Sequence, residues 1–273
     1  TLNSDGIYEI KNAGNLFWFA SLVNGDHTLA EFDKQNAGAN AVLVKDIDLE
    51  NREWSPIMNF NGTFDGQNHT ISNLNITDTS TYSGLFGKIS GTLKNFTVKG
   101  NITLSADGDY IGGVAGYADA AKITNIASYI NISNTAGVLK HVGGVVGGID
   151  NKETFVDKCV YYGTINLKNS SDCIGGIVGY SNAGARISNC ANHGTVSASK
   201  NDAYVGGILG YVNNTNPTVK DCYNYGTVSN GESQKYCGAI IGWARNYTSG
   251  NISNNYYLDS SSSLAFGSDS KSG

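Results

Sequence analysis

Two groups of acidic residues near the N-terminus could perform acid–base chemistry. Asp46 and Asp48 stand two residues apart, and Asp65 with His69 flanks the stretch Phe-Asp-Gly-Gln-Asn-His. Two carboxylates facing each other across a sugar would suit a glycoside hydrolase, and a calcium-binding cluster of acids beside a base would suit a lyase. The simpler interpretation is that Asp46 and Asp48 face solvent, and that Asp65 belongs to a tight turn. We therefore expect no enzyme active site here.

Other catalytic motifs are missing from the sequence. It contains no Gly-x-Ser-x-Gly, no His-Glu-x-x-His, no P-loop and no dinucleotide-binding fingerprint. No Cys and His residues stand at the close spacing of a metal site, so we expect neither a metal nor a cofactor. The histidines are scattered, at His27, His69, His141 and His193.

A repeated Gly-apolar-apolar-Gly tetrad organises most of the chain. It occurs six times at intervals of 29 to 32 residues, with Ala239 in place of the opening glycine in the last copy, and with closing glycines Gly87, Gly116, Gly147, Gly179, Gly210 and Gly242. A fixed period of this length is typical of a solenoid, in which one unit stacks on the next. Abundant Gly, β-branched residues and Asn with few helix formers indicate an all-β chain.

Each tetrad is followed by two further strand-like runs. The first has the form of Ile187-Ser188-Asn189-Cys190, and the second that of Gly194-Thr195-Val196. Three short strands account for a repeat of roughly 31 residues. We predict a parallel β-helix in which equivalent residues of neighbouring coils form ladders, with right-handed coiling from the usual hand of parallel crossovers.

Aromatic side chains recur directly after the closing glycine and form the candidate binding site. The column reads Lys88, Tyr117, Gly148, Tyr180, Tyr211 and Trp243, so the candidate ligand-binding residues are Tyr117, Tyr180, Tyr211 and Trp243. An outward row of rings could bind sugars or a protein, although stacked rings also stabilise a sheet by themselves. The same two interpretations apply to two more columns, which are Lys99, Tyr129, Tyr162, His193 and Tyr225, and Tyr110, His141, Tyr204 and Tyr236.

The cysteines also follow the repeat. Cys159, Cys190 and Cys222 share one position, where their spacing does not exclude a disulfide but their side chains would point in parallel. We favour a ladder of small buried thiols. Cys237 aligns with aliphatic residues and is expected in the core, whereas Cys173 aligns with polar aromatics and is expected to be partly exposed.

The chain divides into three parts. Residues 1–78 form an N-terminal cap with irregular first coils, and a helix over about 12–24 would cover the open strand edge. Asn12 is its expected N-cap and Gly25 its stop, and Leu16, Phe19, Ala20 and Val23 line one face. Residues 79–258 form the six repeats. Residues 259–273 are rich in Ser and are expected to be a tail or linker.

The repeats resemble the GLUG-motif repeats of bacterial surface and secreted proteins. The resemblance covers about residues 82–257 and rests on the tetrads, the strands ending in Cys and the Gly-Thr-Val strands. It implies an extracellular, adhesin-like part of a longer protein from gut or oral bacteria. Such repeats also accompany some IgA-cleaving metallopeptidase domains and carry no known catalytic residues themselves.

Charge and hydropathy exclude several partners. The net charge of −5 with only 18 Lys and Arg does not suit a nucleic-acid binder, and no stretch is long and apolar enough to span a membrane. We expect a non-catalytic secreted or cell-surface module that binds a glycan or a protein of a host or bacterial surface. A carbohydrate-active β-helix enzyme and a pure spacer remain alternatives.

Overall fold

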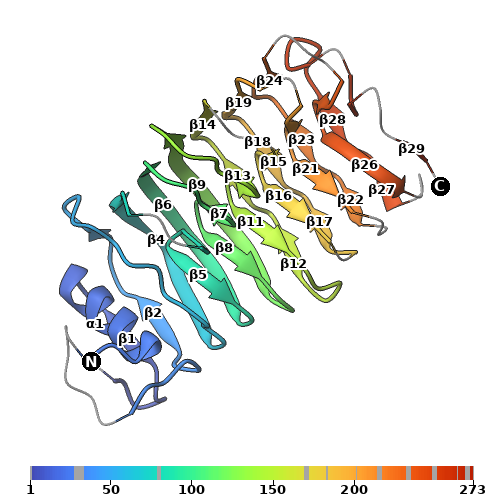
Figure 1. The fold of residues 1–273 in the computed structure, drawn as a ribbon. Helices are drawn as coiled ribbons and strands as arrows, with labels where there is room; N and C mark the ends of the chain where they lie inside the picture. Colours follow the sequence, from blue (N-terminus) through green and yellow to red (C-terminus); the bar gives the residue numbers. More distant parts are fainter. Residues whose placement is uncertain are drawn as a thin grey trace.

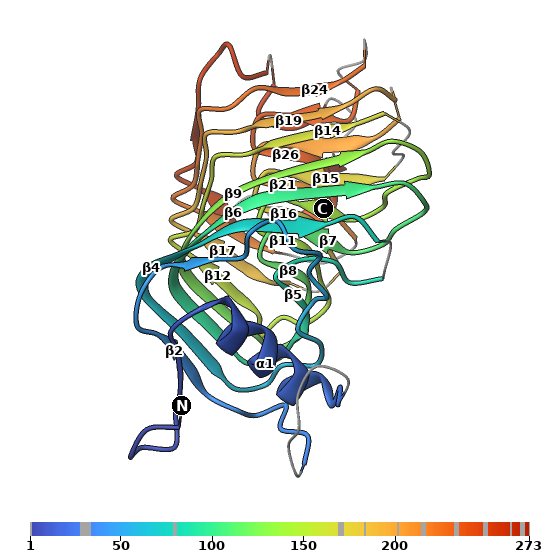
Figure 2. The same ribbon diagram turned by 90° about the vertical axis from the view of Figure 1, so that its left-hand side faces the viewer.

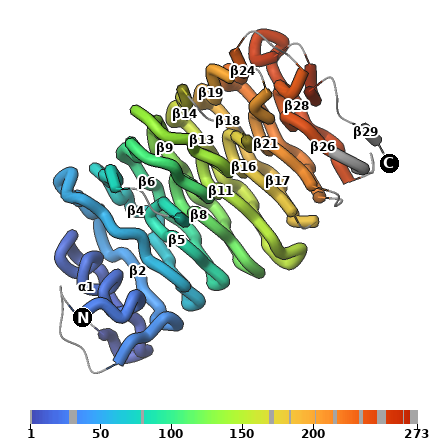
Figure 3. The backbone as a smooth tube through the Cα atoms, viewed as in Figure 1, coloured from blue at the N-terminus to red at the C-terminus, as the bar shows by residue number. Residues whose placement is uncertain are grey.

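The protein is a parallel β-solenoid of about seven turns with one short helix, as the computed structural model shows (Figure 1). Successive coils follow one another from the N-terminus to the C-terminus (Figure 3). The structure describes residues 2–27, 34–78, 81–168, 172–182, 184–200, 202–213, 217–231, 235–247, 251–262, 264–267 and 271–272. Within these residues, no helix has the length and apolar character that a membrane crossing needs.

Three parallel sheets run along the solenoid in the described part of the chain. The wide sheet consists of β1 (Tyr8–Ile10), β2 (Ala41–Leu43), β3 (Ile47–Asp48), β4 (Thr63–Ile76), β6 (Thr92–Leu104), β9 (Lys122–Asn134), β12 (Phe155–Asp157), β13 (Val160–Tyr161), β14 (Thr164–Leu167), β17 (Arg186–Ser188), β18 (Ala191–Asn192), β19 (Thr195–Ala198), β22 (Thr218–Lys220), β23 (Tyr223–Asn224), β24 (Val228–Asn230), β27 (Ile252–Ser253) and β28 (Tyr256–Tyr257). The tetrad sheet consists of β5 (Phe86–Ile89), β8 (Ala115–Ala118), β11 (Val146–Ile149), β16 (Val178–Ser181), β21 (Leu209–Val212), β26 (Ile241–Tyr247) and β29 (Lys271–Ser272). The corner sheet consists of β7 (Ile111–Gly112), β10 (Val142–Gly143), β15 (Cys173–Gly175), β20 (Tyr204–Gly206) and β25 (Cys237–Gly238).

The tetrad turns the chain between the corner and tetrad sheets. Its opening glycine lies in the turn, and its closing glycine lies on the tetrad sheet. A Cβ added to Gly144 would lie 2.2 Å from the Gly176 carbonyl oxygen and 2.4 Å from the Tyr161 ring. No side chain fits there, which explains why glycine recurs at this position in the repeat.

The two runs after the tetrad belong to one sheet rather than to two sides of the coil. In β6 and β9 they are one continuous strand, and in later coils β12, β13 and β14 pair in register with β9. A left-handed residue bends each coil, with φ between 52° and 59° at Asn95, Asn125, Lys158, Asn189, Asp221 and Asn254. Asn and Asp adopt this conformation more readily than most residues, which accounts for their frequency in this column.

The N-terminal helix α1 (Ala13–Asn24) covers the first coils (Figures 1 and 2). The Asn12 side chain accepts a hydrogen bond from the Asn15 N–H at 2.9 Å, and Gly25 ends the helix with φ 71°. The predicted face is buried, and Phe19 contacts the Phe60 and Phe64 rings at centroid distances of 6.2 and 6.3 Å. The predicted capping helix is therefore observed.

The Ser-rich C-terminal segment differs from the expected linker. Ser261 and Ser262 are buried, and the Ala239 and Ile240 N–H groups donate to the Leu264 and Ala265 carbonyls at 2.7 and 2.9 Å. These backbone bonds add a partial coil, because the open end of the stack offers unpaired donors whatever side chains follow. Residues 263, 268–270 and 273 of this segment lie outside the described residues.

Candidate binding surfaces

The four predicted binding residues lie in one column of the tetrad sheet. Tyr117, Tyr180, Tyr211 and Trp243 occupy β8, β16, β21 and β26, in register with Lys88 and Gly148. Tyr180 and Tyr211 stack at 5.8 Å with an interplanar angle of 9°, and Tyr211 and Trp243 stack at 5.2 Å with 18°. All four side chains are half-buried.

A second aromatic column packs against the first. Tyr110 meets Tyr117 edge-on at 5.1 Å, and His141 lies 4.4 Å from Tyr180, measured between ring centroids. The gap at Gly148 has a direct cause, because an added Cβ there would lie 2.4 Å from the Tyr110 ring. Much of the ring surface in both columns is therefore covered by other rings, which stabilises this face and leaves less ring area open to a ligand.

Polar groups edge these rings. The Tyr117 hydroxyl donates to Asp150 at 3.2 Å, and His141 Nδ1 lies 2.5 Å from Asp109 Oδ1. Burial, followed by the nearby Asp109 charge, raises the pKa of Tyr110 to about 12. The Tyr110 hydroxyl is therefore protonated at neutral pH and can donate a hydrogen bond to a ligand.

The wide sheet carries a more exposed ladder. Tyr129, Tyr162, His193 and Tyr225 stack in sequence at centroid distances of 4.6, 5.0 and 4.9 Å, with interplanar angles of 13°, 16° and 9°. Its tyrosines are 39%, 42% and 49% exposed, and Lys99 lies 5.1 Å from the Tyr129 ring centroid. Near-parallel neighbours cover the ring faces, so the ladder presents ring edges and hydroxyls to solvent. We name these four residues the wide-sheet ladder.

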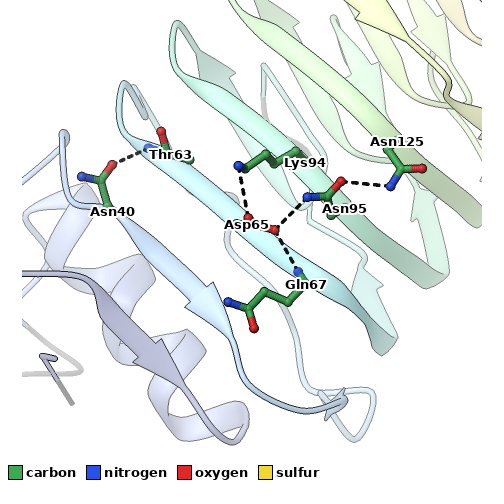
Figure 4. Close-up of polar contacts among 7 residues, drawn as sticks. All are labelled: Asn40, Thr63, Asp65, Gln67, Lys94, Asn95 and Asn125. Carbon is green, nitrogen blue, oxygen red and sulfur yellow. Dashed lines mark hydrogen bonds and ion pairs between the residues drawn. The ribbon is translucent and has the colours of Figure 1, made fainter. Parts of the chain in front are cut away.

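Polar side chains form a row at the bend of the wide sheet. Figure 4 shows Asp65 accepting from the Gln67 N–H at 2.9 Å and from Asn95 at 3.1 Å, while Asn125 donates to Asn95 at 2.9 Å. Lys94 Nζ lies 3.2 Å from the same carboxylate. The hydrogen-bonded row spans three coils, from Asp65 through Asn95 to Asn125, and the next coil carries Lys158 at this position.

The acidic residues with catalytic potential are held in hydrogen bonds to neighbouring backbone and side-chain groups. Asp65 is not paired with His69, whose Nδ1 instead lies 3.1 Å from Asp46 Oδ1. Asp46 accepts from the Thr70 N–H at 2.9 Å, and Asp48 accepts from the Glu50 N–H at 2.8 Å. These backbone hydrogen bonds, with smaller contributions from neighbouring side chains, lower the pKa of both carboxyl groups. Asp48 holds a turn, Asp46 joins its coil to the next strand, and both side chains face solvent, as expected from the sequence.

The thiols are free and buried. Cys159, Cys190, Cys222 and Cys237 have no exposed surface, as the ladder interpretation predicted. Cys173 was expected to be partly exposed, and this is wrong, since it is 4% exposed. Its neighbours in the column are large rings that reach solvent, whereas a short thiol at the same backbone position stays beneath them. No group of three or more His, Cys, Asp or Glu in the described ranges could hold a metal ion.

Comparisons with known proteins agree with the repeat and the fold. Residues 170–197, which include one tetrad and the two runs after it, match the family described as the GLUG motif. A solved structure from Bacteroides ovatus, described as a "putative immunoglobulin A1 protease", has a TM-score of 0.60 over 94% of this chain and 85% of that chain, at 18% identity. No curated protein matches the chain. The chain is a β-solenoid that carries the GLUG motif, as the sequence predicted.

Proposed function

We propose that this chain is a non-catalytic module of a secreted or cell-surface protein, and that it binds a glycan or a surface protein along the solenoid. The observation that supports this best is the wide-sheet ladder, which keeps rings and hydroxyls in contact with solvent over four consecutive coils. Exposed tyrosines bury a large area on binding and lose little rotamer entropy.

The non-catalytic part of the proposal rests on the state of the acids. General acid catalysis needs a carboxyl group whose pKa is raised toward the working pH. Asp46 and Asp48 have the opposite property, because backbone N–H groups favour their ionised forms. The extracellular location rests on the GLUG motif, since this family is described from surface and secreted proteins.

Binding to arrayed glycans and to mucin tests the proposal. The double variant Tyr129→Ala/Tyr162→Ala changes the wide-sheet ladder, and Tyr180→Ala/Tyr211→Ala is its matched control on the half-buried face. We expect the first variant to lose binding while it keeps the circular dichroism spectrum of the parent. If both folded variants lose binding equally, the wide-sheet ladder is not the specific binding site. If the chain binds neither glycans nor proteins, a spacer is the better interpretation.

A further inference from the structure

A column of small side chains runs beside the wide-sheet ladder. Two residues before each ladder position, the register aligns Thr70, Thr97, Ala127, Val160 and Ala191 on consecutive coils. All five are only half-buried, so the column faces solvent. The next two coils place Tyr223 and then Tyr256 at this position, where the rings stack at 5.6 Å. The small column therefore ends at a wall of two tyrosines.

The small column is the floor of a depression in the surface. A pocket of about 150 Å³ is lined by Thr97, Ala127 and Val160 from the floor, by Asn125 and Lys158 from the row of bent residues, and by Asn68, which also has a positive φ. Tyr129 and Tyr162 stand on the opposite side of the floor, two residues further along each strand. A second pocket of about 230 Å³ lies at the end of the column, against Tyr223, Tyr225 and Tyr256.

We propose that this column binds a linear glycan, with one pyranose ring to each coil. The inference rests on the proposed function and names the ligand class and its direction. Neighbouring coils of a parallel sheet are about 4.8 Å apart, which is close to the length of one pyranose residue in an extended β-1,4-linked chain. Ring edges of Tyr129, Tyr162 and His193 flank the last three coils of the column. Amide side chains stand at the bend of every coil except the one that carries Lys158, so successive sugars meet similar polar partners.

An extended peptide fits the column less well. Peptide residues in a strand advance by about 3.3 Å, so they would fall out of step with the coils after a few residues. The backbone N–H and C=O groups of the floor are used within the wide sheet, so a peptide could not add to it as a further strand. The donors and acceptors left over belong to side chains, which suits hydroxyl groups.

Most polar groups along the column are neutral, which suits a neutral sugar. Lys158 is the one cation in the row of bent residues, where the equivalent residues Asn125 and Asn189 are neutral. Asp221 lies one coil beyond Ala191, at the tyrosine wall. Lys99, beside the column, lies 5.1 Å from the Tyr129 ring centroid. A neutral chain can use the amides and hydroxyls of the remaining coils without a fixed charge of its own.

The test is binding of the whole chain to cello-, xylo- and chito-oligosaccharides from disaccharide to hexasaccharide, measured by calorimetry. The affinity for at least one series should rise with each added sugar and level off at the pentasaccharide, because the small column spans five coils. An affinity that does not depend on chain length would overturn the inference.

Two substitutions shorten the small column by introducing a tyrosine, which is the residue that ends the column at Tyr223 and Tyr256. Ala191→Tyr should make the affinity level off one sugar sooner, and Val160→Tyr two sugars sooner, with a loss of about tenfold for each excluded sugar that made a good contact. Asn166→Tyr is the matched control, on an exposed position of β14 in the same coil as Val160, and should leave the length dependence unchanged.

The outcomes separate this inference from the proposed function. Glycan binding that Ala191→Tyr and Val160→Tyr leave unchanged would place the ligand elsewhere and overturn the inference, while the binding function would stand. Binding to a protein but to no oligosaccharide would do the same. Failure to bind any glycan or protein would overturn both.

Discussion

Replacing Tyr162 with alanine removes one ring from the middle of the wide-sheet ladder. Tyr162 stacks on Tyr129 at 4.6 Å and on His193 at 5.0 Å, so the change breaks two cross-strand contacts. Such contacts contribute about 0.2–1 kcal/mol each. The free energy of unfolding should therefore fall by about 1 kcal/mol, because the tyrosine is 42% exposed and its loss leaves no buried cavity.

Urea unfolding of Tyr162→Ala, His193→Ala and the double variant measures the contact between the two rings. The coupling energy should be about 0.2–1 kcal/mol and favourable. Solenoids can unfold repeat by repeat, so hydrogen exchange of β13 and β18 should accompany circular dichroism. Thr164→Ala, an exposed change two residues away, is the control and should alter stability by less than about 0.5 kcal/mol. A coupling energy of zero would show that the rings do not stack in solution.

Other predictions concern the core, the acids and the thiols. Asn192→Leu should lower the free energy of unfolding by about 2–4 kcal/mol, because its buried amide accepts from the Gly194 N–H at 3.0 Å and donates to Asn224 at 2.8 Å; exposed Asn182→Leu is the control in the same urea titration. Burial raises the pKa of Asp65, but hydrogen bonds from Gln67, Asn95 and Lys94 outweigh it and hold that pKa below 3.8. Its contribution to stability is therefore complete above pH 3.8 and is lost as the pH falls through the lowered value, so Asp65→Asn should show a weaker decrease in melting temperature on acidification. All five cysteines should react with a thiol reagent only after denaturation, since they are buried and burial raises the pKa of Cys173 and Cys190 well above the usual value; a fast-reacting thiol in the native protein would contradict this.

The repeat predicts register well and strand boundaries less well. Aligning the closing glycines placed Tyr180, Tyr211 and Trp243 in one column, and the structure pairs them as predicted. The alignment did not reveal that the tetrad spans a corner between two sheets. A glycine permits both a turn and a close approach, so its presence does not say which of the two occurs.

The bend in the wide sheet escaped prediction for a related reason. Asn95 and Asn125 occupy the third position of runs that were predicted as simple strands. One left-handed residue redirects the chain there, yet pairing continues on both sides of it within β6 and β9. Sequence patterns mark the residue that can bend, whereas the pairing of the flanking strands depends on the neighbouring coils.

The exposure of the rings in each aromatic column depends on residues outside that column. The sequence did not separate the tetrad-sheet rings from the wide-sheet ladder, because both follow the same period. The difference arises because Tyr110 packs beside Tyr117, whereas the wide-sheet ladder is flanked by residues as small as Ala127 and Val160. The small column was not identified from the sequence, because small residues give no signal unless their neighbours are known.

Repetition also determines how a binding site of this kind responds to mutation. If each coil contributes one weak contact, the free energy of binding is the sum of several similar contributions, and alanine at one coil removes only one of them. Residues that obstruct the column act differently, because a chain that lies across several coils cannot pass a tyrosine at Ala191 or Val160. The length at which affinity levels off is therefore a sharper measure of the site than the affinity lost in any single alanine variant.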